Sequence, residues 1–532
     1  MHKLALLALM SVGCAGAAAQ DRPNILLIVA DDLGYTDVGP YGGEIRTPHI
    51  DGLAREGILF TGFHTAPVCA PTRAMLLSGN NNHVAGMGTQ YGFYDAQINL
   101  EGYEGHLSDR IAPFPRLLRD AGYHTYSAGK WHLGTAEEHS AKAAGFERHF
   151  NLSHGSAAHF HAVGMHPGGS HYREDGELAQ YPDGSYSTEV FTDRLIEYIE
   201  SNRGDGQPFF AFAAYTSPHW PLQVPDDYLY RYSGRYDAGY DALREARFAA
   251  AKAAGVIAET AELPPRNDAI KPWDALNAED RRIEARKMEL YAAMVENLDF
   301  HIGRLRDYLR STGLYENTLI VFMSDNGAAG GDFYRVGPYV DYIRAHYDNS
   351  YDNMGKPTSF VTYDAPWAEA SSAPYSRYKG YTRQGGITAP LIIAGASVDR
   401  RDVSNDNYLT VMDLAPTFLE LANTKYPDDP DLYPMLGESM VEVLAGNTHA
   451  VHDENYAWVF YLRGRAFIRQ GDWKLTNLDP PFEESRLELF NLADDPGETT
   501  NLAARDPERF AAMVGLWHAK RQELGILLPE DF

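Results

Sequence analysis

The stretch that decides the fold reads Asn24-Ile25-Leu26-Leu27-Ile28-Val29-Ala30-Asp31-Asp32, an apolar run followed at once by two carboxylates. Three further apolar runs lie along the chain, at residues 124–128, 208–216 and 318–324. Continuous runs of this length are typical of strands buried on both faces of a largely parallel sheet. The sequence therefore predicts such a sheet, to which each run contributes one strand.

Two amphipathic stretches separate these runs. Each places apolar residues three or four positions apart, and they pass through Phe191, Leu195, Tyr198 and Ile199, and through Leu290, Met294, Leu298, Ile302, Leu305 and Leu309. Such spacing gives a helix one apolar face that can pack on a sheet. The alternation of strands and helices predicts an α/β sandwich.

The pattern changes after about residue 405. A helix near residues 409–421 precedes short strand-like pieces at 456–461 and 466–469. We predict a catalytic domain over residues 20–404 and a smaller C-terminal α+β domain, with a short antiparallel sheet, over residues 405–532. Residues 225–280 are charged and rich in alanine, and residues 331–378 hold many tyrosines, prolines and asparagines with little periodicity. Both segments are predicted to be insertions on the sheet.

The first 19 residues have the features of a secretory leader. His2 and Lys3 precede an apolar run at residues 4–10 and small residues that end in Ala17-Ala18-Ala19. We predict cleavage after Ala19 and export of the mature chain to the periplasm or the medium. The apolar run is too short to span a bilayer, so no membrane insertion is expected. A lipoprotein anchored through Cys14 is the less favoured alternative, because Ser11 stands where that signal usually has leucine.

Charge and cysteine content restrict the possible functions. The net charge of -27 argues against nucleic acids and anionic membranes as partners, since both require a basic face. It does not exclude a small anionic substrate, because local cations can reverse the field in one cleft. Without the leader, Cys69 is the only cysteine, so no intramolecular disulfide can form.

Charged and imidazole side chains follow all four predicted strands, where open α/β sheets bind ligands. They are Asp31 and Asp32, Lys130 to His132, Pro218 to Trp220, and Asp325 with Asn326. The two acidic pairs supply only oxygen ligands, and three such carboxylates are costly to gather without a cation. This donor set favours calcium or magnesium over zinc. The alternative is that these pairs only cap following helices.

The surroundings of the single cysteine carry the most specific signal. The sequence Cys69-Ala70-Pro71-Thr72-Arg73 leads into an apolar run that ends at Ser78-Gly79. Pro71 suits a first helical turn, whose free amides can face an anion. The motif resembles the Cys-x-Pro-x-Arg signature of the formylglycine-dependent (type I) sulfatases, in which a maturation enzyme oxidises the cysteine to an aldehyde.

The resemblance extends over nearly the whole mature chain. A second family signature appears at residues 122–132, and further matches are Pro218-His219, residues 324–327, 378–380, 383–386, 472–475, 488–492 and 495–498. Within the family the chain looks most like bacterial arylsulfatases. The resemblance implies an alkaline-phosphatase-like sandwich and hydrolysis of sulfate esters, with aryl sulfates as the first expectation and alkyl sulfates as a second.

The resemblance also implies a mechanism. The aldehyde at position 69 would hydrate to a geminal diol, and one hydroxyl would attack sulfur. Deprotonation of the second hydroxyl would then expel sulfate and restore the aldehyde. A calcium ion, with magnesium or manganese as alternatives, would be bound by Asp31, Asp32, Cys69, Asp325 and Asn326.

Cationic and imidazole side chains share the remaining roles that the resemblance implies. Arg73 and Lys130 would fix the diol and sulfate oxygens, and Asp325 would also accept the proton of the nucleophile. His132 would deprotonate the second hydroxyl, whereas His219 and Lys379 would bind sulfate and assist the leaving oxygen. The implied partners are a small sulfate ester and the maturation enzyme.

Three further points remain open at this stage. A phosphonate monoester or phosphodiester hydrolase could use the same nucleophile, because the cradle does not separate tetrahedral sulfate from phosphate. A non-catalytic anion-binding relative could keep the fold. Aromatic residues of the second insertion, Tyr363 and Trp367 with Pro366, are expected to wall the cleft for an aryl group.

Overall fold

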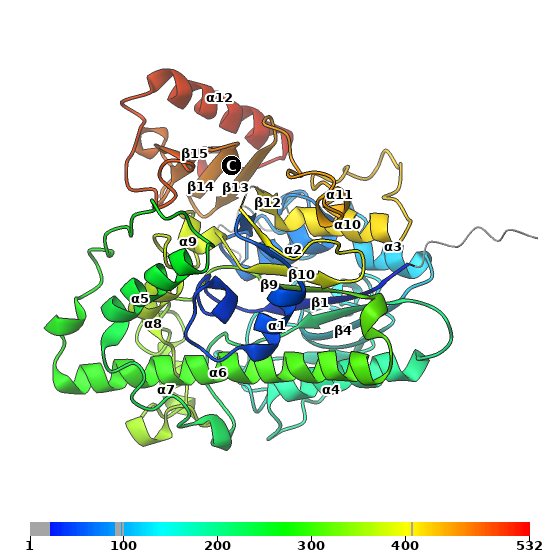
Figure 1. Cartoon of the computed structure of the whole chain (residues 1–532), viewed down its shortest axis with the longest axis horizontal. Coiled ribbons are helices and arrows are strands. Elements are labelled where there is room, and N and C mark those ends of the chain that lie inside the picture. Colours follow the sequence, from blue (N-terminus) through cyan, green and yellow to red (C-terminus); the bar gives the residue numbers. More distant parts are fainter. Residues whose placement is uncertain (1–21, 91–96, 98–99, 406–407, 532) are drawn as a thin grey trace, which may run out of the picture.

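The computed structural model describes residues 22–90, 97, 100–405 and 408–531, so the predicted leader and Cys14 lie outside the described residues. A ten-stranded sheet forms its centre (Figure 1). Its strands are β1 (Asn24–Ala30), β2 (Gly57–Phe60), β4 (His124–Lys130), β5 (Arg148–Leu152), β6 (Tyr172–Glu174), β7 (Glu177–Ala179), β8 (Phe209–Ala214), β9 (Thr318–Ser324), β10 (Leu391–Gly395) and β11 (Val403–Ser404). Their order is β11-β2-β10-β9-β1-β8-β4-β5-β6-β7.

The middle of this sheet is parallel. Strand β1 pairs in parallel with β8 and β9, and β4 pairs in parallel with β8 and β5. Strand β10 is antiparallel to both of its neighbours, which makes the sheet mixed. All four predicted strands are present, and the predicted α/β class is confirmed. The carboxyl ends of β1, β4, β8 and β9 therefore meet at one edge.

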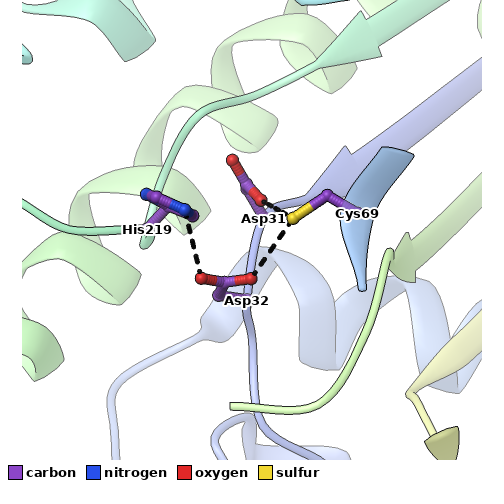
Figure 2. Close-up of side chains that lie close together, drawn as sticks. All are labelled: Asp31, Asp32, Cys69 and His219. Atoms are coloured by element: carbon purple, nitrogen blue, oxygen red, sulfur yellow. Dashed lines mark hydrogen bonds and ion pairs between the residues drawn. The ribbon is translucent and has the colours of Figure 1, made fainter. Parts of the chain in front are cut away.

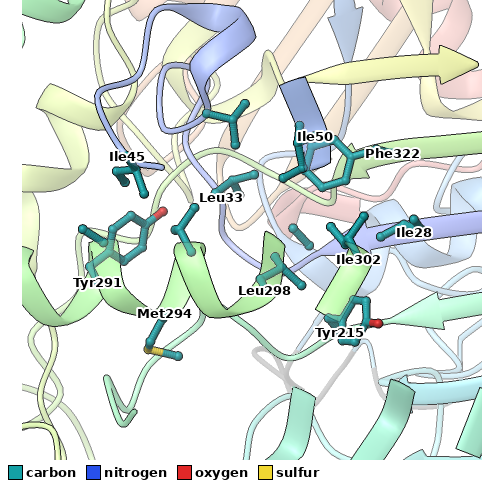
Figure 3. Close-up of a cluster of buried hydrophobic side chains, with 14 of the residues drawn as sticks. Ile28, Leu33, Ile45, Ile50, Tyr215, Tyr291, Met294, Leu298, Ile302 and Phe322 are labelled. Atoms are coloured by element: carbon teal, nitrogen blue, oxygen red, sulfur yellow. The ribbon is translucent and has the colours of Figure 1, made fainter. Parts of the chain in front are cut away.

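Helices cover both faces of the sheet (Figure 1). One face carries α1 (Pro48–Glu56), α4 (Ser187–Asn202) and α6 (Ala278–Ser311), and the other carries α2 (Cys69–Ser78), α3 (Phe114–Asp120) and α10 (Leu414–Leu421). The two helices expected from the sequence are α4 and α6. Figure 3 shows Leu298 and Ile302 of α6 beside Ile28 of β1. Alternate residues of β1 pack into the two cores, which explains the continuous apolar run.

The C-terminal part contains the predicted antiparallel sheet. It consists of β13 (Ala457–Leu462), β14 (Arg465–Gln470), β15 (Trp473–Asn477) and β16 (Glu488–Asn491), with α12 (Pro507–Glu523) packed against it. Helices α10 and α11 (Val441–Leu444) instead share the core of the large sheet. A boundary at residues 404 and 405 remains our proposal for the domain division, although the small sheet itself begins at Ala457.

The two predicted insertions contain short helices. These are α5 (Gly239–Ala253), α7 (Val340–His346) and α8 (Asp364–Ser371). The remaining elements are α9 (Gln384–Ile387), the paired strands β3 (Phe63–His64) and β12 (Leu409–Thr410), and 3-10 turns at Gly39–Tyr41, Glu137–His139, Asp226–Tyr228, Trp273–Ala275, Tyr315–Asn317, Tyr351–Asn353, Val411–Asp413, Glu484–Arg486 and Pro529–Asp531. Within the described ranges, no helix combines the length and apolar character that a membrane crossing requires.

Candidate active site

The predicted site residues converge at the carboxyl ends of the parallel strands. Asp31 and Asp32 follow β1, Asp325 follows β9, and Lys130 is the last residue of β4. His219 lies in the loop after β8. Because these strands are neighbours with a common direction, side chains almost 300 positions apart in sequence become adjacent, as in the hydrogen bond from the Asp32 amide to Asp325 Oδ1.

Cys69 begins helix α2 and points into this cluster (Figure 2). Its Sγ lies 3.5 Å from Asp31 Oδ1 and 3.7 Å from Asp32 Oδ1. Lys379 Nζ lies 3.1 Å from the same sulfur. Burial, together with the neighbouring Asp325 and Asp31, raises the pKa of the Cys69 thiol to about 12. The unmodified thiol is therefore a poor nucleophile at neutral pH.

Three cations balance the carboxylates, of which Lys130 and Arg73 are buried and Lys379 has 16% of its side chain exposed. Lys130 Nζ lies 2.8 Å from both oxygens of Asp31, and Lys379 Nζ lies 2.6 Å from Asp32 Oδ1. Arg73 donates from Nε and Nη2 to Asp325 Oδ2, at 3.0 and 2.8 Å. Its third nitrogen, Nη1, donates to the carbonyl of Lys130 at 2.9 Å and so fixes the guanidinium in place.

The two adjacent aspartates differ in acidity. Burial, with the charges of Asp325 and Asp32, raises the pKa of Asp31 to about 7 in spite of Lys130. For Asp32, burial acts in the same direction, but the charge of Lys379 and its hydrogen bond, with the charge of Lys130, outweigh it and lower the pKa. Asp32 therefore loses its proton more readily than Asp31.

The cluster fits a hard divalent cation. Asp32 Oδ2 and Asn326 Oδ1 are buried and have no hydrogen-bond partner among the described residues. The Asn326 amide donates 2.7 Å to Asp32 Oδ1, which joins it to the carboxylates. Ligand atoms of Asp31, Asp32, Cys69 and His219 lie within 4.8 Å of one another. The oxygen atoms of Asp31, Asp32 and Asn326 are the ligands that calcium and magnesium prefer, and Cys69 and His219 add one sulfur and one nitrogen beside them.

The two predicted active-site histidines occupy different positions. His219 Nε2 lies 3.4 Å from Asp32 Oδ2, whereas its Nδ1 donates to the carbonyl of Trp220 at 2.7 Å. His132 has a left-handed backbone with φ of 61°, and its buried Nδ1 has no hydrogen-bond partner among the described residues. Burial and nearby cations, including Lys130, lower the pKa of both histidines well below the usual value, so both rings are neutral bases.

A cleft of about 860 Å³ opens beside His132. Its wall includes Trp220, Phe333 and Tyr339. The Trp220 ring lies 4.1 Å from the His219 ring and 4.5 Å from Phe333, measured between ring centres. No aspartate or glutamate of the described chain lines this cleft, although acidic residues outnumber basic ones by 73 to 46 in the sequence.

The Sulfatase family model matches residues 23–424. The chain belongs to the sulfatase family. It is 40% identical over 457 residues to an arylsulfatase of Klebsiella aerogenes, covering 83% of this chain and 96% of the relative. It is also 38% identical over 541 residues to an uncharacterized sulfatase of Schizosaccharomyces pombe, covering 97% and 96%. The predicted family is therefore confirmed, and the family hydrolyses sulfate esters.

Solved sulfatase structures share the fold of this sulfatase. The crystal structure of Ps i-CgsB superposes with a TM-score of 0.67 at 24% identity, covering 94% of this chain and 92% of that one. The structure of BT4656 in complex with its substrate D-glucosamine-2-N,6-O-disulfate gives 0.62 at 21% identity, covering 95% and 98%. These neighbours confirm the predicted alkaline-phosphatase-like architecture.

One expectation about the sulfatase cleft is wrong. Tyr363 is buried and stacks on Tyr291 with 4.2 Å between ring centres, and Trp367 is fully buried against Tyr236 and Tyr240. Pro366 lies on α8 beside Trp367 and is absent from the cleft lining. Trp367 therefore packs against the first insertion and Tyr363 against α6, so neither side chain faces the cleft.

Sequence reasoning missed several residues that line the cleft. Phe333 and Tyr339 belong to the insertion that was expected to wall the cleft, but at its other end. Arg463 reaches the lining from the turn between β13 and β14. A basic residue in a hairpin turn has no local motif, and only the packing of the small sheet beside the cleft reveals it.

Proposed function

We propose that this sulfatase hydrolyses aryl sulfate esters, and alkyl sulfates more slowly, to a phenol or alcohol and inorganic sulfate. The observation that carries this proposal is the position of Cys69, with Sγ at 3.1 to 3.7 Å from Lys379, Asp31 and Asp32. The arylsulfatase of Klebsiella aerogenes and the aromatic wall of the cleft support the aryl preference. The lack of carboxylates in that wall suits an anionic substrate.

The proposed nucleophile is formylglycine, made from Cys69 by a maturation enzyme. Once hydrated, this group supplies an attacking hydroxyl and a second hydroxyl on the same carbon. A thiol with a pKa of about 12 could not supply a comparable nucleophile. Because only 1% of Cys69 is exposed, the maturation enzyme has to reach it before the chain folds.

Asp31, Asp32, Asp325 and Asn326, with the group at position 69, would hold the proposed calcium ion, for which magnesium or manganese could substitute. The ion would supply positive charge for the sulfate oxygens. The residues themselves prepare the site, because Arg73 anchors Asp325 and Lys130 anchors Asp31 within 2.8 Å. Asp325 would also accept the proton of the attacking hydroxyl.

Arg73, Lys130 and Lys379 would bind the diol and sulfate oxygens. Asp31 and its neighbours raise the pKa of Lys130, and Asp32 raises the pKa of Lys379, in each case against the effect of burial. Both lysines therefore stay protonated over the working pH range. Lys379 can donate a hydrogen bond from Nζ to the leaving oxygen. His219, whose Nδ1 already donates to the carbonyl of Trp220, would assist the same oxygen from Nε2 once that nitrogen has taken up a proton.

His132 would remove the proton from the second hydroxyl. Its Nδ1 is buried without a partner among the described residues, and its lowered pKa keeps the ring neutral. A neutral imidazole with an unoccupied nitrogen can accept a proton. We also propose export to the periplasm or the medium, for which the leader at residues 1–19 is the support.

A comparison of substrates tests the proposed function. Protein produced together with a formylglycine-generating enzyme should turn over nitrophenyl sulfate faster than the matched nitrophenyl phosphonate, and both faster than sulfated monosaccharides. A preference for the phosphonate would establish the competing hydrolase activity. Failure on every ester by protein whose intact mass proves the aldehyde would favour an anion-binding role.

A further inference from the structure

Lys379 lies on a segment that the large sheet does not hold. It follows α8 and precedes α9, and its own amide donates to the carbonyl of Ala328 at 3.0 Å. The next amide, of Gly380, donates to the carbonyl of Pro67 at 2.7 Å. No strand bounds this part of the described chain, so contacts from elsewhere must fix the backbone that carries Lys379.

The small C-terminal sheet supplies those contacts. Arg465 of β14 donates from Nη1 to the carbonyl of Gly380 at 3.0 Å, and its guanidinium lies 4.4 Å from the centre of the Tyr381 ring. Arg465 Nε also donates to the carbonyl of Leu478 at 2.9 Å, which ties the side chain to its own sheet. The cation thus joins the Lys379 segment to β14.

A buried ion pair holds the following residues. Lys474 of β15 donates to the carbonyl of Thr382 at 2.5 Å and lies 2.8 Å from Glu498 Oε1. The other oxygen of Glu498 accepts the amide of Gln384 at 2.6 Å. Both charged side chains are fully buried, and such a pair is weak evidence for stability because desolvation offsets the attraction. Its value lies in fixing two backbone groups at defined positions.

We propose that Arg465, together with the Lys474–Glu498 pair, positions the ammonium of Lys379 against Asp32 and the nucleophile. Arg465 and Lys474 lie in the C-terminal sheet, and Glu498 lies in the loop after β16. None of them contacts the reacting atoms, so they act through the backbone of residues 380–384. The Lys379 contacts of 2.6 Å to Asp32 and 3.1 Å to Cys69 are short enough for a small backbone shift to break them. The inference rests on the proposed function, because it assigns Lys379 to the site.

A double-mutant cycle on matured protein tests this coupling. Arg465→Met should lower kcat/KM for nitrophenyl sulfate by about tenfold, since a misplacement of about 1 Å has effects of that order or more. The double variant Arg465→Met/Lys379→Ala should lose little more kcat/KM than Lys379→Ala alone, because both substitutions remove the same contribution, that of the positioned Lys379 ammonium. Arg465→Lys should restore part of the activity. If the fold-losses in kcat/KM of the two single variants multiply in the double variant, the proposal is overturned.

Arg486→Met is the matched control, because Arg486 lies in the same part of the chain with 48% of its side chain exposed and pairs with Glu483 at the surface. It should leave kcat/KM unchanged. If Arg465→Met does not fold, Arg465→Lys takes its place in the cycle. If the wild type turns over no aryl sulfate, the proposed function fails. The same four proteins are then compared by their calorimetric affinity for inorganic sulfate. Additive losses in the free energy of sulfate binding would overturn the positioning role independently of the proposed function.

Discussion

Cys69 shows how a single position determines the chemistry of the site. Cys69→Ala should abolish turnover, because it removes the nucleophile. Cys69→Ser should react once at most, since a serine carbon bears one hydroxyl and cannot expel sulfate from the same carbon. Intact-mass analysis should find a stalled serine bearing one sulfate. Sustained turnover by either variant near the wild-type rate would overturn the formylglycine mechanism.

The basic residues divide the proton transfers between two steps. If His219 and Lys379 assist the leaving oxygen, their replacement by alanine should slow alkyl sulfates much more than nitrophenyl sulfate, because nitrophenolate departs without a proton. His132 would act after the leaving group has departed, so His132→Ala should release a burst of phenol and let the sulfated enzyme accumulate. The measurement is rate against leaving-group basicity for each variant.

The loop that carries Gly155 packs against the His132 ring and offers a second test of the role assigned to His132. A Cβ on Gly155 would lie 2.4 Å from His132 Cε1 and 2.6 Å from Nε2, so the loop leaves no room for a larger residue. Gly155→Ala should displace the ring and lower turnover by about tenfold or more, as misplaced catalytic groups do. Gly515→Ala in α12, where no heavy atom lies within 4 Å, should instead stabilise the protein by about 0.5–1 kcal/mol and leave turnover unchanged. Unchanged turnover of Gly155→Ala, together with a crystal structure that shows the ring displaced, would exclude a role for the ring.

A buried histidine makes the stability of the C-terminal half depend on pH. His452 lies 2.9 Å from Asp413 and 3.4 Å from Glu438. Burial lowers its pKa, but these carboxylates outweigh that effect and raise it above 6.5. The pair therefore stabilises the fold fully below the unfolded-state pKa of about 6.5, and the contribution is lost as pH rises through the higher folded-state value.

The melting temperature of His452→Gln should accordingly fall below that of the wild type by more at about pH 6 than at about pH 9, the difference at low pH corresponding to about 1–2 kcal/mol. His518→Gln is the control, because 43% of the His518 side chain is exposed beside Glu484. A gap for His452→Gln that does not change with pH would show that the ring is neutral in the folded protein.

The strands and the site were predictable for one physical reason. Burial on both faces forces continuous apolar runs, and the four runs predicted all four central strands together with the residues that follow them. Insertions lack that constraint. Trp367 and Phe333 are both aromatic residues in one irregular segment, and only the packing of α8 decides that the first faces the core and the second faces the cleft. Contacts such as Arg465 to Gly380 join residues 85 positions apart and leave no local pattern.

The charge of the whole molecule contrasts with that of its active site. A net charge of -27 repels anions at long range, whereas the cleft lining has the cation Arg463 and no carboxylate among the described residues. Three buried carboxylates lie beneath it, each paired with a cation. The molecule thus separates its negative surface from a site that receives negative charge.

The buried carboxylates also make the response of the whole fold to metal depend on pH. In the metal-free protein the pKa of Asp31 is raised from 3.8 to about 7, chiefly by burial. For an acid whose folded-state pKa is raised, the folded state is favoured below the unfolded value and loses that advantage as pH rises through the folded value. Metal-free stability should therefore fall between about pH 4 and pH 7.

A calcium ion needs ionised ligands and offsets their repulsion, so the rise in melting temperature on adding calcium to chelator-treated protein should be larger at about pH 8 than at about pH 5. Asp325→Ala should lose most of this rise, because it removes one carboxylate from the second of the two strands that build the site. An equal rise at both pH values, or a full rise in Asp325→Ala, would show that calcium binds elsewhere.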